Sequence, residues 1–178
     1  MHMAESQTGD ILYLKRGGEL ILYLSGDVKA SLAVSMYHRL VPHLEAGDVD
    51  HVHLDLSRVA YIDSTTIGTF IKARKMLSQA DAELHLWNLS EQTTRILSTM
   101  HLLGYFDVGH TDALDELRTG VLDRIPEAEK EFITDDYVLT AHQDIVEAEP
   151  SLKETFEPLI TALRQNVERK GADGADSS

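Results

Sequence analysis

Strand-like and helix-like segments alternate along the first two thirds of the chain, and this alternation restricts the fold more than any other feature. After an opening pair of strands, Asp10–Arg16 and Glu19–Ser25, each further strand pattern is followed by a helix pattern. The resulting order is β-β-α-β-α-β-α-β-α. Strands that are joined through helices pair in parallel, with right-handed crossovers. The sequence therefore predicts an α/β fold with a mostly parallel sheet of four to five strands and helices packed on it.

The opening pair of strands is expected to form an antiparallel hairpin at the edge of the sheet. Gly17 and Gly18 separate the two strands, and a two-residue glycine link suits the primed turns that match strand twist. Helices are expected after Asp27, from Ser64 and from Ser90, because apolar residues there recur at helical spacing. The later strands are expected in Val49–Leu56, Glu83–Trp87 and Tyr105–Val108.

The last third of the chain has a different character. Residues 119–178 carry 14 acidic and 6 basic side chains, a net charge of −8, and show no strand pattern. Leu152–Val167 has an apolar stripe at helical spacing, which must be buried on the domain, on a partner or in a homodimer. We expect a domain in 8–118, an acidic helical extension in 119–170 and a disordered tail in 171–178, where no apolar side chain is larger than alanine.

Composition disfavours several classes of function. A net charge of −14 disfavours nucleic acid as a partner, because its binding depends on phosphate neutralisation by Lys and Arg. The absence of cysteine excludes disulfides, thiol nucleophiles and cysteine-ligated metals. No apolar run could cross a membrane and no signal-peptide pattern opens the chain, so a cytoplasmic protein without membrane insertion is expected. Without a glycine-rich phosphate loop or a catalytic motif, we expect no enzyme and no cofactor.

Three polar features are interpreted as ordinary surface. His51 and His53 share one strand face beside Asp55, a spacing that can ligate metal. The sequence offers no identifiable third ligand, so no metal site is expected. The basic cluster in Lys72–Lys75 is interpreted as a solvated helix face, with an acidic partner surface as the alternative. His142, in the extension, is expected to be solvated.

The segment Leu54–Gly68 carries the clearest functional signal. A buried strand leads there into a helix, and unpaired backbone N–H groups meet the positive end of the helix dipole at such a start. A hydroxyl at this place could accept a phosphoryl group, whose charge would change what the surface binds. The simpler interpretation is an N-cap. The residues at the helix start are Asp63, Ser64, Thr65 and Thr66.

The same segment resembles the signature of STAS domains, above all that of the bacterial anti-sigma-factor antagonists. The family's pattern is D-S-S-G-L-G at a helix start, and residues 63–68 read Asp-Ser-Thr-Thr-Ile-Gly. Leu24–Asp27 is similar to the family's L-T-G-E at a strand end, and Ser90–Leu103 is similar to its S-P-x-V-x-R-L-F helix. The resemblance covers Asp10–Arg118 and implies a STAS-type fold.

The resemblance also implies a phosphorylation switch. The family's phosphoacceptor is the serine directly after the aspartate, which is Ser64 here, with Thr65 as the second choice. The unphosphorylated form would bind a partner that is both serine kinase and anti-sigma factor. Phosphorylation would release this partner, and a serine phosphatase would reset the switch. The implied partner-binding residues are Asp27, Lys29, Asp63, Ser64, Thr65, Thr66 and Ile67.

The chain departs from the family pattern in three places. Thr66 replaces a glycine, Lys29 stands where the family often has an acid, and the extension after residue 118 does not belong to the domain. These departures concern which partner is bound more than the fold. The alternative function is a non-enzymatic STAS subunit of an ABC lipid-transport or stressosome-like assembly, which would not need the hydroxyl cluster.

Overall fold

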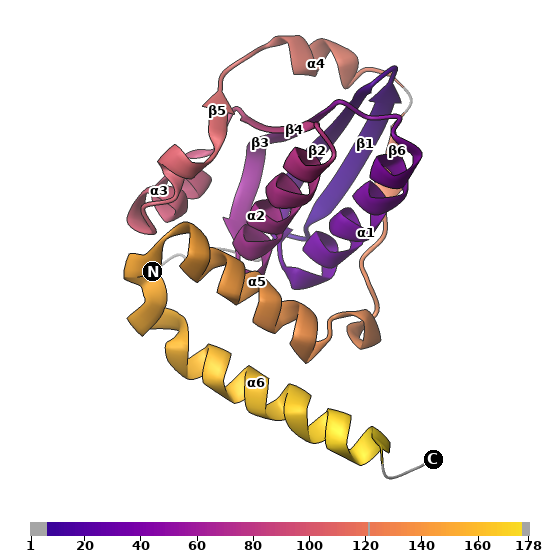
Figure 1. Cartoon of the computed structure of the whole chain (residues 1–178). Helices are drawn as coiled ribbons and strands as arrows, with labels where there is room; N and C mark the ends of the chain where they lie inside the picture. Colours follow the sequence, from indigo (N-terminus) through magenta and orange to yellow (C-terminus); the bar gives the residue numbers. More distant parts are fainter. Residues whose placement is uncertain (1–6, 121, 176–178) are drawn as a thin grey trace.

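The domain is built on a six-stranded mixed sheet, with α5 and α6 to one side of it (Figure 1). The structure, a computed structural model, describes residues 7–120 and 122–175. The strands lie in the order β5-β4-β3-β2-β1-β6; β2 to β5 pair in parallel, and β1 is antiparallel to both of its neighbours. The strands are β1 (Asp10–Arg16), β2 (Glu19–Val28), β3 (His51–Ile62), β4 (Glu83–Trp87), β5 (Asp107–Gly109) and β6 (Asp123–Ile125).

Most of the helices lie on one face of this sheet, whereas α4 packs on the other face, where its Leu114 clusters with Ile21 and Tyr23 of β2. The first two helices cover the sheet, α5 packs on α2, and α6 packs on α5 (Figure 1). No helix among the described residues is both long and apolar enough to cross a membrane. The helices are α1 (Ala30–Ala46), α2 (Ser64–Gln79), α3 (Glu91–Thr99), α4 (Ala113–Leu117), α5 (Asp135–Ala148) and α6 (Lys153–Ala175), with 3₁₀ turns at Leu103–Tyr105, Lys130–Phe132 and Pro150–Leu152.

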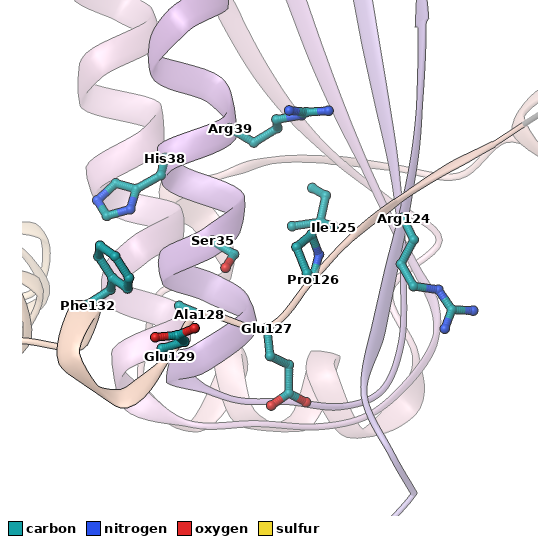
Figure 2. A pocket seen from close by; sticks show the side chains of 10 residues that line it. All are labelled: Ser35, His38, Arg39, Arg124, Ile125, Pro126, Glu127, Ala128, Glu129 and Phe132. Atoms are coloured by element: carbon teal, nitrogen blue, oxygen red, sulfur yellow. The ribbon is translucent and has the colours of Figure 1, made fainter.

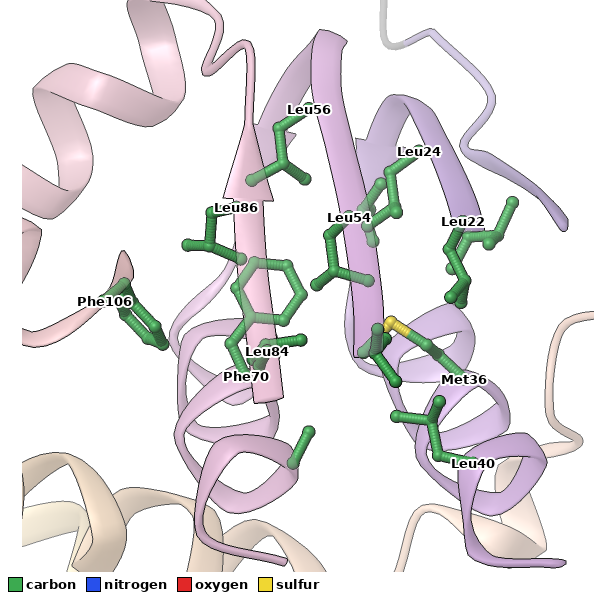
Figure 3. Close-up of a cluster of buried hydrophobic side chains, with 14 of the residues drawn as sticks. Leu22, Leu24, Met36, Leu40, Leu54, Leu56, Phe70, Leu84, Leu86 and Phe106 are labelled. Carbon is green, nitrogen blue, oxygen red and sulfur yellow. The ribbon is translucent and has the colours of Figure 1, made fainter. Parts of the chain in front are cut away.

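The main core lies between the sheet and its helices (Figure 3). Alternate residues of a strand point to the same face, so Leu22, Leu54 and Leu86 of three neighbouring strands all face the helices. These leucines are fully buried, as are Met36 of α1 and Phe70 of α2. The predicted α/β fold and the hairpin of β1 and β2 are confirmed, but this hairpin does not form the edge of the sheet, because β6 pairs with the outer side of β1. The intervening residues of the same strands face the opposite side.

Several segments differ from the sequence-based expectation. The sheet has six strands and not four to five, β3 continues to Ile62 beyond the expected end at Leu56, and the last parallel strand is Asp107–Gly109 and not Tyr105–Val108. The three residues of β6 pair antiparallel with β1 and extend the sheet beyond residue 118, where the domain was expected to end. A three-residue strand is too short to show an alternating pattern, so this pairing had no sequence signal. The helix α6 continues to Ala175, although a disordered tail was expected from residue 171. A helix that has already formed adds a hydrogen bond with each further residue, which explains the extension.

The apolar stripe of the extension is partly buried within the same chain, although Leu159 is 39% exposed. Leu139 of α5 packs with Ile160 and Leu163 of α6 in a small separate cluster. Leu152 and Phe156 also pack against the main core. The expected homodimer through Leu152–Val167 stays a prediction.

Candidate functional site

Asp63 links the end of β3 to the starts of two helices. Its Oδ1 accepts hydrogen bonds from the backbone N–H and the hydroxyl of Thr66, both at 2.8 Å. Its Oδ2 accepts a hydrogen bond of 3.0 Å from the backbone N–H of Ala30, the first residue of α1. The capping interpretation is confirmed, and both carboxylate oxygens are used within the domain.

Asp63→Ala is expected to lower the free energy of unfolding by about 2 kcal/mol, because it removes the caps of two helix starts at once. Ser90→Ala is the matched control, since Ser90 caps only α3 through a 3.1 Å bond from the backbone N–H of Thr93. Its expected loss is about 1 kcal/mol. Urea unfolding of both variants measures the difference, and equal losses would contradict the double role of Asp63.

Three of the expected contact residues are buried and face no partner surface in this structure. The Thr66 hydroxyl lies 3.0 Å from the carbonyl oxygen of Val28, and its side chain is fully buried. Ile67 belongs to the main core. Thr65 is 7% exposed. The hydroxyl cluster looks polar in sequence, but the helical turn directs these side chains inward. Direct partner contact by these three residues stays a prediction.

Asp27 and Lys29 lie together before α1. The Nζ of Lys29 lies 3.9 Å from Oδ2 of Asp27, and the lysine side chain is about half exposed. Lys29 therefore presents a positive charge close to the start of α2, where the family pattern often has a negative one. Among the expected contact residues, Lys29 is well placed for a direct contact.

Ser64 has a partner that sequence reasoning missed. Its Oγ lies 2.8 Å from Nε2 of His142 in α5. The Nδ1 of His142 lies 2.7 Å from the carbonyl oxygen of Val138, which can only accept, so Nδ1 carries the proton. In the neutral imidazole, Nε2 then accepts a hydrogen bond from the Ser64 hydroxyl. His142 was expected to be solvated, but it is only 1% exposed.

The reason for this correction lies in the spacing along α5. Val138, His142 and Ile145 recur at helical intervals and so lie on one face of the helix. This spacing could have placed His142 on the buried face, but it could not have identified the helix that covers it. Only the packed structure brings residue 142 to residue 64.

The helices α5 and α2 approach each other closely at a glycine. A Cβ added to Gly68 would lie 2.4 Å from the carbonyl oxygen of Ala141, so a side chain at this position would push α5 away. One turn earlier on α5, the hydroxyl of Tyr137 lies 2.9 Å from Oγ1 of Thr69 in α2. Burial of this phenol raises the pKa of Tyr137 well above its usual value. The contact is therefore continuous and well packed.

Opposite charges extend the same contact. The Nζ of Lys75 lies 2.8 Å from Asp144 and 2.7 Å from Glu147, and Lys72 lies 3.3 Å from Asp144. Hydrogen bonds to the two carboxylates raise the pKa of Lys75. The interpretation of this basic cluster as a solvated face is wrong for both lysines. Their acidic partner is α5 of the same chain, and an acidic surface on another molecule stays a prediction.

A cavity of about 460 Å³ lies apart from this contact (Figure 2). It is formed by α1 on one side and by the segment that follows β6 on the other. None of the expected site residues lines it. The lining residues are Ser35, His38, Arg39, Arg124, Ile125, Pro126, Glu127, Ala128, Glu129 and Phe132.

The sheet order, the hairpin of β1 and β2 and the Asp-capped helix start that carries Ser64 define a class of small α/β domain. The chain belongs to the STAS domain family, whose model matches residues 10–114. The match ends before α5 and α6. The helix that covers Ser64 therefore lies outside the family domain.

Known relatives are named as antagonists of anti-sigma factors. The chain is 33% identical over 109 residues to the anti-sigma-B factor antagonist of Staphylococcus epidermidis, which covers 61% of this chain and 90% of that protein. The protein of the same name from Staphylococcus aureus (strain NCTC 8325 / PS 47) is 30% identical over 109 residues, which are 61% of this chain and 90% of that protein. Both names describe antagonists of an anti-sigma factor.

Solved structures show the same fold. The anti-sigma factor antagonist SpoIIAA in its unphosphorylated form superposes with a TM-score of 0.52 at 17% identity, covering 63% of this chain and 98% of that chain. An anti-sigma factor antagonist from Mycobacterium paratuberculosis gives a TM-score of 0.52 at 17% identity, covering 65% and 99%. At these identities, the likeness concerns the fold alone.

Proposed function

We propose that this protein is an anti-sigma-factor-antagonist-like regulator controlled by phosphorylation of Ser64. Unphosphorylated, it binds a partner that is both serine kinase and anti-sigma factor; phosphorylation releases the partner, and a serine phosphatase restores binding. One observation carries the proposal. Of the three hydroxyls at the start of α2, that of Ser64 takes no part in the fold of the domain itself, since Thr66 serves the cap and Thr65 is buried.

The start of α2 is electrostatically suited to the modification. The positive end of the helix dipole favours a phosphate there, so the domain can carry the added charge without unfolding. The same dianion at the centre of an interface lowers affinity strongly, because it must be desolvated against the partner. Phosphorylation can therefore change binding without changing the fold.

The helix α5 adds a second control to this switch. Ser64 is only partly exposed and its Oγ is hydrogen-bonded to a buried imidazole, so α5 hinders the approach of a kinase to this hydroxyl. Docking of α5 and binding of a partner at Ser64 therefore exclude each other. In this proposal, the extension covers the switch in cis, and its release precedes recognition by the kinase.

The test is to map the modified residue in the full-length protein. Ser64→Ala is used as bait in a native lysate, the captured serine kinase is purified, and phosphopeptides of the wild type and of Ser64→Ala and Thr65→Ala are mapped. We expect phosphorylation of the wild type and of Thr65→Ala, but none of Ser64→Ala. The proposal fails if phosphate maps to another residue, or if no captured kinase modifies the wild type.

A further inference from the structure

The sheet face away from α1 and α2 carries a group of imidazoles and carboxylates. His51 of β3 pairs in register with Glu83 of β4, and His53 pairs with His85 two residues further along. All four side chains point to the same face, because they occupy alternate positions on two adjacent strands. Asp107 of β5 stands in register with His85 on the next strand.

Three potential ligand atoms of this group converge. The Nδ1 of His51 lies 3.3 Å from Nε2 of His85, and 3.4 Å from Oε2 of Glu83. The same Oε2 lies 3.5 Å from Nε2 of His85. Ligands about 2.0–2.1 Å from a tetrahedral zinc ion are separated by about 3.3–3.4 Å. The three atoms thus form a triangle of nearly the size of one face of a zinc tetrahedron.

Hydrogen bonds around the triangle determine which nitrogens are available. The Nδ1 of His85 is bonded to Oδ2 of Asp107 and so carries the proton, which leaves a lone pair on Nε2. A metal-bound histidine usually donates its other ring N–H to a carboxylate in this way, which fixes the orientation of the imidazole. His53 is engaged elsewhere, since its Nδ1 accepts from the indole N–H of Trp87 at 2.9 Å and its Nε2 lies 3.4 Å from Glu19.

We propose that His51, Glu83 and His85 bind a divalent transition-metal ion of the zinc type, with Asp107 orienting His85. Two imidazoles and one carboxylate leave a fourth position, as in zinc sites that hold a water molecule. This position faces solvent, because the side chains of His51 and Glu83 are 43% and 66% exposed. The ion would connect β3 to β4. The site lies on the other face of the sheet from α2 and does not depend on the proposed function of Ser64.

The test is a titration of the untagged full-length protein with Co²⁺, a spectroscopic substitute for zinc. Tetrahedral Co²⁺ absorbs visible light, and Trp87, the one tryptophan of the chain, lies 6.0 Å from the His85 ring and reports binding by fluorescence quenching. We expect one ion per chain, displaced by Zn²⁺. Glu83→Gln and His85→Gln are expected to weaken binding at least tenfold, and Asp107→Asn about tenfold.

His110→Gln is the matched control. His110 is an exposed histidine with a carboxylate 3.7 Å away, but it lies outside the group, so its substitution should leave Co²⁺ affinity unchanged. Far-UV circular dichroism verifies each fold; if His85→Gln does not fold, the exposed Glu83→Gln decides. The proposal is overturned if the wild type shows no tetrahedral spectrum, or if His110→Gln weakens binding as much as Glu83→Gln does.

Discussion

Ser64→Asp is expected to abolish binding of the serine kinase that Ser64→Ala retains. The aspartate places a fixed negative charge where the partner must close on the start of α2. Burying an uncompensated charge in an interface costs about 3 kcal/mol or more, which is a loss of affinity of more than a hundredfold. Pull-down from native lysate with both baits, followed by calorimetry with the purified kinase, measures the effect.

Ser78→Asp is the control for this comparison. Ser78 is exposed near the other end of α2, so its substitution adds the same charge to the same helix without touching the proposed interface. It should bind like the wild type. Retention of one ATPase or scaffold protein by both Ser64 baits would instead favour the alternative of a transport or stressosome-like subunit, in which Ser64 is only part of a helix start.

Asp144→Lys is expected to release α5 and to accelerate phosphorylation of Ser64 by about tenfold or more. The substitution removes the carboxylate between Lys72 and Lys75 and places a third cation beside them. Loss of these partly buried ion pairs costs about 2 kcal/mol of docking free energy. If the kinase acts only on the open form, its rate follows the open population, and each 1.4 kcal/mol changes that population tenfold. Initial rates with the purified kinase measure this.

Two further variants separate release of α5 from a change in net charge. Glu154→Lys changes the charge equally at an exposed site of α6 and should leave the rate unchanged. Gly68→Ala releases α5 by crowding Ala141, while alanine favours the helix α2 itself. Hydrogen exchange reports whether α5 has opened. An open α5 together with an unchanged phosphorylation rate would show that the extension does not cover the switch.

Local patterns explain why much of the domain could be predicted. Alternation along β2, β3 and β4 marks the buried leucines, and the change to helical spacing after Asp63 marks the start of α2. The cap by Asp63 also depends mainly on neighbours in sequence, since two of its three hydrogen bonds reach Thr66. Such patterns extend over only a few residues and can be recognised without knowledge of the fold.

The contacts that give the surfaces their proposed roles depend instead on strand and helix pairing. His51 and His85 meet only because β3 and β4 pair in one particular register, and a shift of one residue would turn one of them to the other face. The hydrogen bond between Ser64 and His142 joins residues 78 positions apart. The sequence alone determined the STAS domain, its capped helix and the serine at its start. Tertiary packing decided that α5 covers this serine, because contacts between distant segments follow from how their buried faces fit together and not from local spacing.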